Sequence, residues 1–281
     1  MDSHGDLFGT TVAGGIAGNG TVFELVPPSH QNGGGWSEKV IFDFGTYNGY
    51  AGAGPNGGLV QTANGINNQA EPRGALYGTT FSGGSLSNGG VVFQLLPPKN
   101  GSKWAISVLY VFQYPPDNSL TGAVPAAGVY MDQNGNLFGT TTQGGVLFPN
   151  GGNGSYGTVY ELSPPSQPAG AWGMNVIYAF TDQNGDGYYP SSNLIADACG
   201  ALYGATSYGG DNSCLGGCGI AFQLQNIGGN WMETVLHDFR GPTEVYPGDL
   251  LLGADGALYG TTRGAGIGCN GNGCGTVFEL Q

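Results

Sequence analysis

The heptapeptide G-A-L-Y-G-T-T at residues 74–80 decides the fold, because close copies of it recur along the whole chain. Self-similarity at a regular period is the sequence signature of solenoids, propellers and other repeat architectures. The anchor leucines of successive copies lie 69, 61, 65 and 56 residues apart. They are Leu7, Leu76, Leu137, Leu202 and Leu258. We therefore treat residues 1–281 as a single repeat domain built from five copies of one unit.

Three further segments recur at similar distances from each anchor. A glycine-rich loop leads to a second segment such as G-T-V-F-E-L at 20–25, whose apolar and polar residues alternate as in a half-buried strand. Four copies continue into a third segment marked by a Trp, a Val and a Phe, for example Trp104, Val108 and Phe112. A proline-led segment such as P-A-A-G-V-Y at 125–130 then turns through D-x-x-G into the next anchor.

Four short strands in 56 to 69 residues match the size of one β-propeller blade. The sequence thus predicts an all-β β-propeller of about five blades, each with four short antiparallel strands. A β-solenoid is the main alternative, but its coils are shorter than this period. The first copy begins at the end of a proline-led strand and the last stops after its second strand. We therefore expect one blade to be incomplete or to be completed by a neighbouring molecule.

The composition fits a turn-rich β protein and excludes several function classes. Glycine contributes 57 residues, whereas charged residues make up only 9% of the chain. The formal net charge of −13 argues against nucleic acid and against an anionic membrane as partner, because both require a surface rich in Lys and Arg. No apolar run is long enough to span a membrane. The sequence also contains no nucleophile elbow, phosphate-binding loop or zincin motif.

Four of the five cysteines form two close pairs, which we predict to be local disulfides. The pairs stand in C-L-G-G-C at 214–218 and C-N-G-N-G-C at 269–274, that is, Cys214 with Cys218 and Cys269 with Cys274. Free thiols are the first alternative; a metal site is the second, although its knuckles usually have C-x₂-C spacing. Disulfides indicate an oxidising compartment. Cys199 is left over, and we expect a free, half-buried thiol.

The unit G-x-L-[YF]-G-T-T followed by G-T-V-F-x-L resembles the GloVer tandem repeat of the choice-of-anchor group of bacterial surface or secreted proteins. The resemblance covers all five copies, and the last two carry the variants C-G-I-A-F and C-G-T-V-F. It implies export and attachment to the cell surface through interchangeable C-terminal anchors, and it implies no established enzymatic activity. No catalytic residue is therefore carried over. We expect an extracellular or cell-surface location.

The segment T-D-Q-N-G-D-G-Y-Y at 181–189 departs most sharply from the repeat. Asp182, Asn184 and Asp186, followed by Gly187, fit the start of a calcium-binding loop, which places oxygens at alternate positions around one cation. The twelfth position is Asn193 rather than the glutamate of an EF-hand. The segment predicts a single Ca²⁺ site, with a plain Asn-Gly and Asp-Gly turn as the alternative.

Aromatic and acidic residues outside the repeated positions are the other candidates for function. Four tyrosines in variable loops are the predicted ligand contacts: Tyr188, Tyr189, Tyr208 and Tyr246. The tryptophans precede the third strand in every case and are interpreted as packing residues. If the protein is an enzyme, carboxylates converging on the propeller axis would act as in glycosidases. The acidic candidates are Glu71, Asp182, Asp238 and Glu244, and solvated loop charges are the alternative interpretation.

Three functions follow from these residues. The first is a non-enzymatic binding or structural module for a glycan or another surface polymer. The second is a propeller-type glycoside hydrolase or lyase that uses a carboxylate pair. The third is a self-assembling surface or fibre subunit whose incomplete terminal blades pair between copies.

Overall fold

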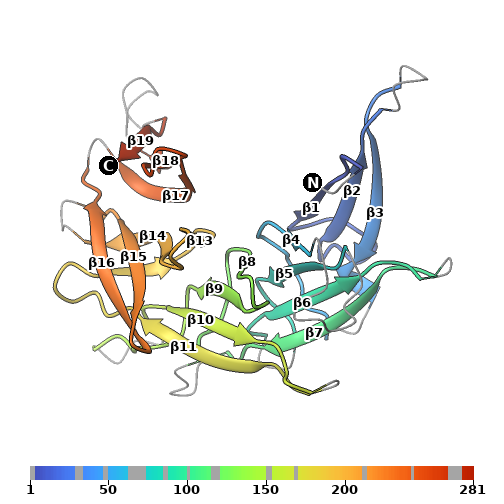
Figure 1. Cartoon of the computed structure of the whole chain (residues 1–281), viewed down its shortest axis with the longest axis horizontal. Coiled ribbons are helices and arrows are strands. Elements are labelled where there is room, and N and C mark those ends of the chain that lie inside the picture. The colour runs from blue at the N-terminus through green and yellow to red at the C-terminus, as the bar shows by residue number, and fades with distance from the viewer. Residues whose placement is uncertain are drawn as a thin grey trace.

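The structure is a computed structural model of the whole chain, and it contains five small antiparallel sheets arranged as the blades of a β-propeller (Figure 1). It describes residues 4–28, 34–46, 50–62, 74–84, 88–99, 102–114, 121–149, 154–167, 170–210, 214–241, 244–264 and 274–281. Within these ranges the helical content is one short turn, Phe44–Thr46. The predicted all-β propeller with five blades is confirmed.

Each blade is named by its strands in chain order. Blade 1 holds β1 (Leu7–Thr11), β2 (Thr21–Val26) and β3 (Ser37–Asp43). Blade 2 holds β4 (Val60–Gln61), β5 (Leu76–Thr80), β6 (Val91–Leu96) and β7 (Ala105–Val111). Blade 3 holds β8 (Tyr130–Met131), β9 (Leu137–Thr141), β10 (Thr158–Ser163) and β11 (Gly173–Ala179). Blade 4 holds β12 (Gly187–Pro190), β13 (Ile195–Ala196), β14 (Leu202–Gly209), β15 (Ile220–Ile227) and β16 (Asn230–Asp238). Blade 5 holds β17 (Val245–Leu252), β18 (Leu258–Gly264) and β19 (Val277–Leu280).

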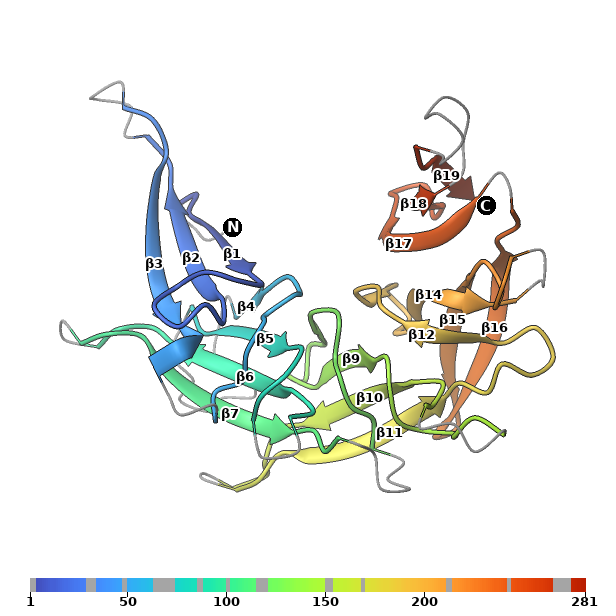
Figure 2. The ribbon, with the colours of Figure 1, turned by 180° about the vertical axis from the view of Figure 1, so that it is seen from behind.

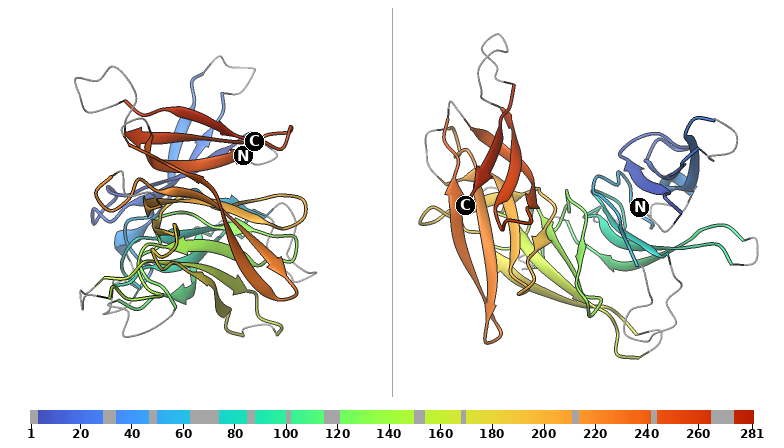
Figure 3. Two further views of the ribbon diagram at one scale, coloured as in Figure 1. Left: turned by 90° about the vertical axis from the view of Figure 1, so that its left-hand side faces the viewer. Right: turned by 45° about the horizontal axis from the view of Figure 1, so that its top comes forward.

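The end blades correct the expectation of a single incomplete blade. Among the described residues, blade 1 has no strand inside β1 and blade 5 has no strand outside β19. The five sheets form an arc rather than a closed ring, with β1–β3 and β17–β19 on opposite sides of an opening (Figure 2). The separation persists in the tilted view of Figure 3.

The proline-led strands are shorter than predicted in the three middle blades, where β4, β8 and β13 each have two residues. Close backbone approach between neighbouring blades explains the difference. A Cβ atom on Gly57 would overlap the backbone of Gly128, and a Cβ on Gly128 would overlap the carbonyl of Gly58. Most residues of the inner segments therefore contact the neighbouring blade, and only two residues of each pair with a strand of their own sheet.

Aromatic pairs join each blade to the next, and they explain why the repeat conserves its apolar positions. The phenylalanine that follows the third strand packs edge-on against the second-strand aromatic of the following blade. Centroid distances are 5.2 Å for Phe44–Phe93, 5.3 Å for Phe112–Tyr160, 5.3 Å for Phe180–Phe222 and 4.9 Å for Phe239–Phe278. The anchor aromatic contacts the next tryptophan in the same way, in Phe8–Trp104, Tyr77–Trp172 and Phe138–Trp231. Trp104, Trp172 and Trp231 are packing residues, as expected, whereas Trp36 in blade 1 is exposed.

The first threonine of G-T-T also links blades. Thr10 Oγ1 donates to the carbonyl of Gly57 at 2.9 Å, and Thr79 Oγ1 donates to the carbonyl of Ala127 at 2.6 Å. The second threonine stays within its blade: Thr141 Oγ1 and Thr158 Oγ1 lie 2.7 Å apart in blade 3. The second threonine of the anchor motif therefore stabilises its own sheet, and the first threonine bonds that sheet to the following one.

The residue before each inner proline adopts a left-handed conformation. Its φ is +65° at Gly54, +60° at Val124, +54° at Tyr189 and +56° at Tyr246. The amide of this residue donates to a carbonyl of the preceding blade, for example Tyr189 N to Tyr156 O at 2.9 Å and Tyr246 N to Cys218 O at 3.0 Å. A bulky residue with positive φ is strained. The hydrogen bond to the preceding blade therefore stabilises a backbone conformation that Val124, Tyr189 and Tyr246 would not adopt by themselves.

Candidate functional site

The four tyrosines predicted as ligand contacts lie together in one cluster at the boundaries of blades 3, 4 and 5. Tyr188 and Tyr208 stack at 5.3 Å with an interplanar angle of 20°. Tyr189 lies 5.5 Å from Tyr188, and Tyr246 lies 5.6 Å from Tyr208. Tyr156 extends the group, with its ring 5.6 Å from that of Tyr188. We call these five residues the tyrosine cluster.

Two different parts of the repeat supply the tyrosine cluster. Tyr189 and Tyr246 occupy the left-handed position before the inner proline, where blade 2 has Gly54 and blade 3 has Val124. Tyr188 and Tyr208 face each other across the β12–β14 pair, at a place where blades 2, 3 and 5 pair Ala53 with Ser82, Ala123 with Gln143 and Val245 with Gly264. The cluster is therefore specific to one side of the arc, although each backbone position is dictated by the common fold.

Polar groups hold the tyrosine cluster in place. Gln143 Nε2 donates to the Tyr189 hydroxyl at 2.8 Å, and Ser155 Oγ lies 3.4 Å from Gln143 Oε1. Burial, together with the nearby Asp182 carboxylate, raises the pKa of Tyr188 to about 12. Tyr188, Tyr189 and Tyr208 are half-buried, whereas Tyr246 is 36% exposed. The Tyr188 hydroxyl is thus neutral at physiological pH.

The Cys214–Cys218 disulfide is confirmed and borders the tyrosine cluster. Gly216, inside the disulfide loop, has room for no side chain because a Cβ would meet the Tyr188 hydroxyl. Cys274 is also disulfide-bonded, while its expected partner Cys269 lies outside the described residues. Cys199 is free, as predicted, but it is exposed rather than half-buried. Cys199 is exposed because it lies in a surface turn, in which the Asp197 carboxylate accepts a hydrogen bond from the amide of Cys199.

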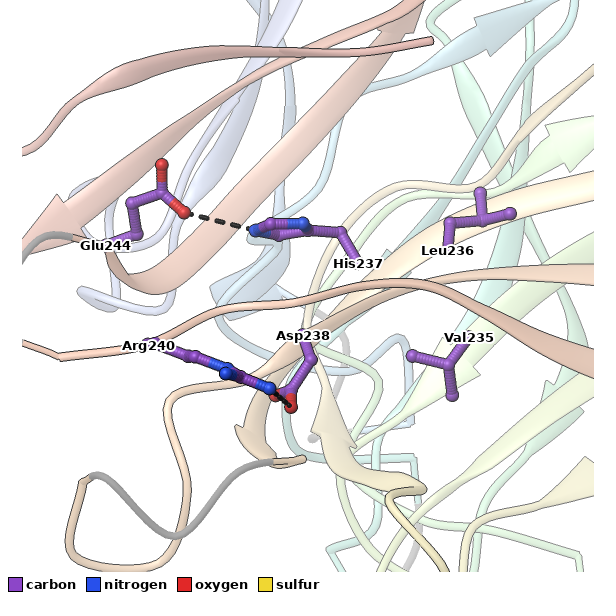
Figure 4. Close-up of a pocket in the computed structure, with 6 residues that line it drawn as sticks. All are labelled: Val235, Leu236, His237, Asp238, Arg240 and Glu244. Atoms are coloured by element: carbon purple, nitrogen blue, oxygen red, sulfur yellow. Dashed lines mark hydrogen bonds and ion pairs between the residues drawn. The ribbon is translucent and has the colours of Figure 1, made fainter.

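Two of the four acidic candidates line one cavity of about 590 Å³ at the end of β16 (Figure 4). Glu244 lies against His237, with Oε2 and Nε2 3.1 Å apart, and Asp238 pairs with Arg240 at 3.6 Å. Val235 and Leu236 complete the lining. Both carboxylates thus stand beside a basic side chain, whereas glycosidase acids work as a pair facing the scissile bond.

The position of this cavity follows from the three-stranded blade 5. In blade 3 the residues equivalent to Leu236 and His237 are Ile177 and Tyr178, which pack against blade 4. Tyr178 reaches Glu233 on β16, the outermost strand of that blade. Blade 5 has no described strand at the corresponding place, so Leu236 and His237 line an open cavity instead. Of the other acidic candidates, Asp182 lies in the 181–187 loop, away from this cavity, and Glu71 is outside the described residues.

The 181–187 loop is arranged as a closed turn. Asp186 is buried, and its carboxylate accepts hydrogen bonds from Thr181 N at 2.7 Å, Thr181 Oγ1 at 2.9 Å and Gly187 N at 2.7 Å. Asp182 and Asn184 are exposed and adopt positive φ. Across the described ranges, no three His, Cys, Asp or Glu side chains come together as metal ligands. The calcium site stays a prediction, and its free oxygen ligands from this motif would be Asp182 and Asn184.

Sequence reasoning missed an acidic contact between blades 3 and 4. The Tyr178 hydroxyl donates to Glu233 Oε2 at 3.4 Å, and Glu233 Oε1 is buried without a hydrogen-bond partner in the described structure. Burial, together with nearby Asp186, raises the pKa of Glu233 to about 7. Comparing the copies marks this position only in part, because Glu233 stands where Ile106 and Met174 stand in blades 2 and 3 but where Glu38 stands in blade 1.

A second cavity, of about 580 Å³, lies between blades 1 and 2. Lys39 and Lys103, two of the six basic residues in the chain, line it together with Trp104. These two lysines are thus placed at the opposite end of the arc from the tyrosine cluster. No helix in the described ranges is long and apolar enough to cross a membrane.

Three solved structures resemble this chain at low sequence identity. A protein provisionally described as a gluconolactonase is 15% identical, with 100% of this chain and 74% of the other covered and a TM-score of 0.47. A xylan β-1,4-xylosidase from Bacillus halodurans C-125 is 13% identical, with 97% and 52% covered and a TM-score of 0.43. An exo-1,5-α-L-arabinanase from a bovine ruminal metagenomic library is 11% identical, with 99% and 94% covered and a TM-score of 0.41. No curated protein matches the sequence.

The repeat itself identifies the family. The sequence profile of the Gloeobacter/Verrucomicrobia repeat matches residues 1–214, which include the first four anchors. The structure adds the fifth copy, because β17, β18 and β19 pair in the same order as the corresponding strands of the other blades. On this evidence, the chain belongs to the Gloeobacter/Verrucomicrobia repeat family.

Proposed function

We propose that the protein is a non-enzymatic extracellular or cell-surface module that binds a neutral glycan through the tyrosine cluster. The observation that carries the proposal is the gathering of Tyr188, Tyr189, Tyr208 and Tyr246 at positions where blades 2 and 3 have no aromatic residue. Tyrosine rings offer an apolar face to a sugar ring together with a hydroxyl at their edge.

The electrostatics favour a neutral polymer over an acidic one. The chain carries a net charge of −13, and Asp182 is close enough to Tyr188 and Tyr156 to raise the pKa of both hydroxyls. An anionic polymer would therefore be repelled at this site. Two of the basic residues, Lys39 and Lys103, line the other cavity, and Arg240 is paired with Asp238.

The extracellular location rests on the disulfide and on the family. A Cys214–Cys218 bond next to the tyrosine cluster fits an oxidising compartment, since such bonds are rare in the cytosol.

A polysaccharide binding assay with single tyrosine variants tests the proposal. The probes are soluble neutral polysaccharides (xylan, arabinan and mixed-linkage β-glucan) and acidic ones (polygalacturonate and alginate). We expect the wild-type protein to bind at least one neutral probe and Tyr246→Ala to weaken that binding about tenfold, since stacking is worth roughly 1–3 kcal/mol per aromatic ring. Tyr114→Ala is the matched control, because Tyr114 has a similar exposure of 39% and lies in the segment after β7. Binding that Tyr246→Ala leaves unchanged, or binding of acidic probes alone, would contradict the proposal.

The enzymatic alternative depends on the cavity of Asp238 and Glu244. A hydrolase would release reducing ends from one of the neutral probes, and Glu244→Gln would abolish that release. Absence of reducing ends with a bound probe supports the non-enzymatic function.

A further inference from the structure

The two end sheets of the arc expose apolar positions that are less exposed at the internal boundaries. Val277 on β19 is 81% exposed. The equivalent second-strand residues of the other blades are fully buried: Val22, Val92, Val159 and Ala221. Leu7 on β1 is 39% exposed, whereas the other anchor leucines, Leu76, Leu137, Leu202 and Leu258, are at most 5% exposed.

The exposed residues of blade 5 belong to one face. The strand register places Leu251 opposite Tyr259 and Thr261 opposite Val277, so these four side chains share one side of the sheet. Leu251 is 67% exposed. Its equivalents Val60, Tyr130 and Ile195 pack against hydrophobic clusters. We call this the leading face, because in each of the other blades it meets the next blade.

The exposed residues of blade 1 lie on the other face of the sheet, the one directed away from blade 2. Leu7, Leu25 and Glu38 align across β1, β2 and β3, as do Phe23 and Val40. Trp36 precedes β3 and is 53% exposed, as is Val40. We call this the trailing face, because in blades 2 to 5 it receives the preceding blade.

Every internal boundary of the arc joins a leading face to a trailing face. The Phe8–Trp104, Tyr77–Trp172 and Phe138–Trp231 contacts are three cases of one anchor aromatic on one tryptophan. The two exposed faces at the ends of the arc are therefore the two halves of the same interface. Large exposed apolar surfaces of this kind mark protein interaction sites.

We propose that a second copy of this chain docks head to tail, with the leading face of blade 5 in one copy against the trailing face of blade 1 in the next. Trp36 of one copy would lie against Tyr259 of the other, as Trp104 lies against Phe8 within the arc. The contact is heterologous, so repeated docking gives a closed ring of copies or an open chain. The inference is independent of the glycan-binding proposal.

Charge sets the conditions under which docking is strongest. Each face carries a glutamate, Glu279 on the leading face and Glu38 on the trailing face, and each copy has a net charge of −13. Salt screens such repulsion, so association strengthens as salt is added.

The experiment uses two variants, each blocked on one face. Val277→Asp blocks the leading face and Val40→Asp blocks the trailing face; both positions are exposed, so neither substitution places a charge in the core. The wild-type protein forms oligomers at micromolar concentration in sedimentation velocity, and each variant alone is monomeric. An equimolar mixture of the two variants forms a dimer that does not grow further, because it has one intact interface. Association by either blocked face falls roughly a hundredfold or more, since an unpaired carboxylate would be buried.

Ile227→Asp is the matched control, because Ile227 is 57% exposed at the end of β15 and lies on neither face. It keeps the wild-type oligomers. Circular dichroism establishes that each variant is folded, and Leu251→Asp replaces Val277→Asp if the latter is not. A wild-type protein that is monomeric at all concentrations and salt levels, because its ends close on each other or stay open, overturns the proposal. A mixture of the two variants that stays monomeric also overturns it.

Discussion

Asn193 donates two hydrogen bonds to Asp249 across the boundary between blades 4 and 5, from N to Oδ1 at 2.8 Å and from Nδ2 to Oδ2 at 2.6 Å. Asn193 Oδ1 also accepts a hydrogen bond from the amide of Gly128 in blade 3 at 2.7 Å. One side chain thus connects three consecutive blades near the inner segments. In the repeat, Gly58 and Gly128 occupy the position that Asn193 and Asp249 fill in the later blades.

This connection predicts the effect of Asp249→Ala. The variant removes both hydrogen bonds from Asn193, and we expect the free energy of unfolding to fall by ~1–2 kcal/mol, a modest loss because the contact is solvent-exposed. Urea denaturation measures the change. Gln225→Ala, at an exposed position of β15, should leave the unfolding free energy unchanged. An equal loss in both variants would contradict a specific role for Asp249.

Tyr246 offers a way to separate stability from binding. Its left-handed backbone costs ~1–2 kcal/mol in a residue other than glycine, and the equivalent residue of blade 2 is Gly54. We therefore expect Tyr246→Gly to be as stable as the wild type or more stable, while its binding of a neutral polysaccharide falls about tenfold. Thermal unfolding and affinity electrophoresis provide the two measurements. A large loss of stability would instead assign the ring contact with Tyr208 a structural role.

Glu233 predicts a pH dependence of stability. Burial, together with Asp186, raises its pKa from 4.5 to about 7. The folded protein therefore holds a proton that the unfolded chain releases between these values. The resulting stabilisation is fully present below pH 4.5 and is lost as the pH rises through 7. Because Glu233 is partly exposed, we expect a loss of about 1–2 kcal/mol.

The matched variant for this prediction is Glu233→Gln, which cannot ionise. The difference in unfolding free energy between wild type and variant should change in favour of the variant between pH 5 and pH 8, by about the same amount. Urea unfolding at several pH values gives this difference and cancels the contribution of the other carboxylates. A difference that is constant with pH would show that Glu233 is ionised throughout.

Asp186 is expected to hold the 181–187 turn whether or not calcium is present. Asp186→Ala leaves three donors without their acceptor, and we expect it to lower the unfolding free energy by about 2–3 kcal/mol in both EDTA and calcium. A loss seen only in calcium would instead identify Asp186 as a ligand. Isothermal titration of the wild type and Asp182→Ala with calcium tests the predicted site directly, and equal heats from the two proteins would end that prediction.

The Cys214–Cys218 disulfide is expected to support the tyrosine cluster. Closing so short a loop contributes ~2 kcal/mol by the chain-entropy estimate, and the loop lies against Tyr188 through Gly216. The double variant Cys214→Ser/Cys218→Ser should lose about that stability and bind neutral polysaccharides more weakly. Cys199→Ser, which removes a free exposed thiol, is the control. Unchanged binding in the double variant would show that the tyrosine cluster is held by its other contacts.

The sequence predicts the fold well wherever one copy of the repeat can be compared with another. Leu76 and its equivalents identify the anchor strand, and the alternation in 20–25 identifies the second strand, because both signals are local. The lengths of β4, β8 and β13 could not be predicted in this way. They depend on the approach of Gly57 to Gly128, two residues in different blades.

The sequence predicts which residues belong to the candidate site, but it does not predict how they are arranged in space. Tyr188, Tyr189, Tyr208 and Tyr246 stand out because the other copies lack them, yet only the packing of blades 3 to 5 brings their rings together. The partners of Asp238 and Glu244 depend on where β16 ends. Alignment of the copies does not single out Glu233, because blade 1 has Glu38 at the same place; its contact with Tyr178 in blade 3 does. Non-local contacts decide each of these cases.

The uniform blade boundary also bears on how such proteins change in size. Because Thr10 and Thr79 reach the next blade through backbone carbonyls, and because one phenylalanine meets one aromatic ring at each step, a duplicated unit brings its own complete set of neighbour contacts. Gene duplication can therefore lengthen or shorten the array by whole blades without any compensating substitution, and copy number becomes a trait that selection can adjust separately from the residues that bind.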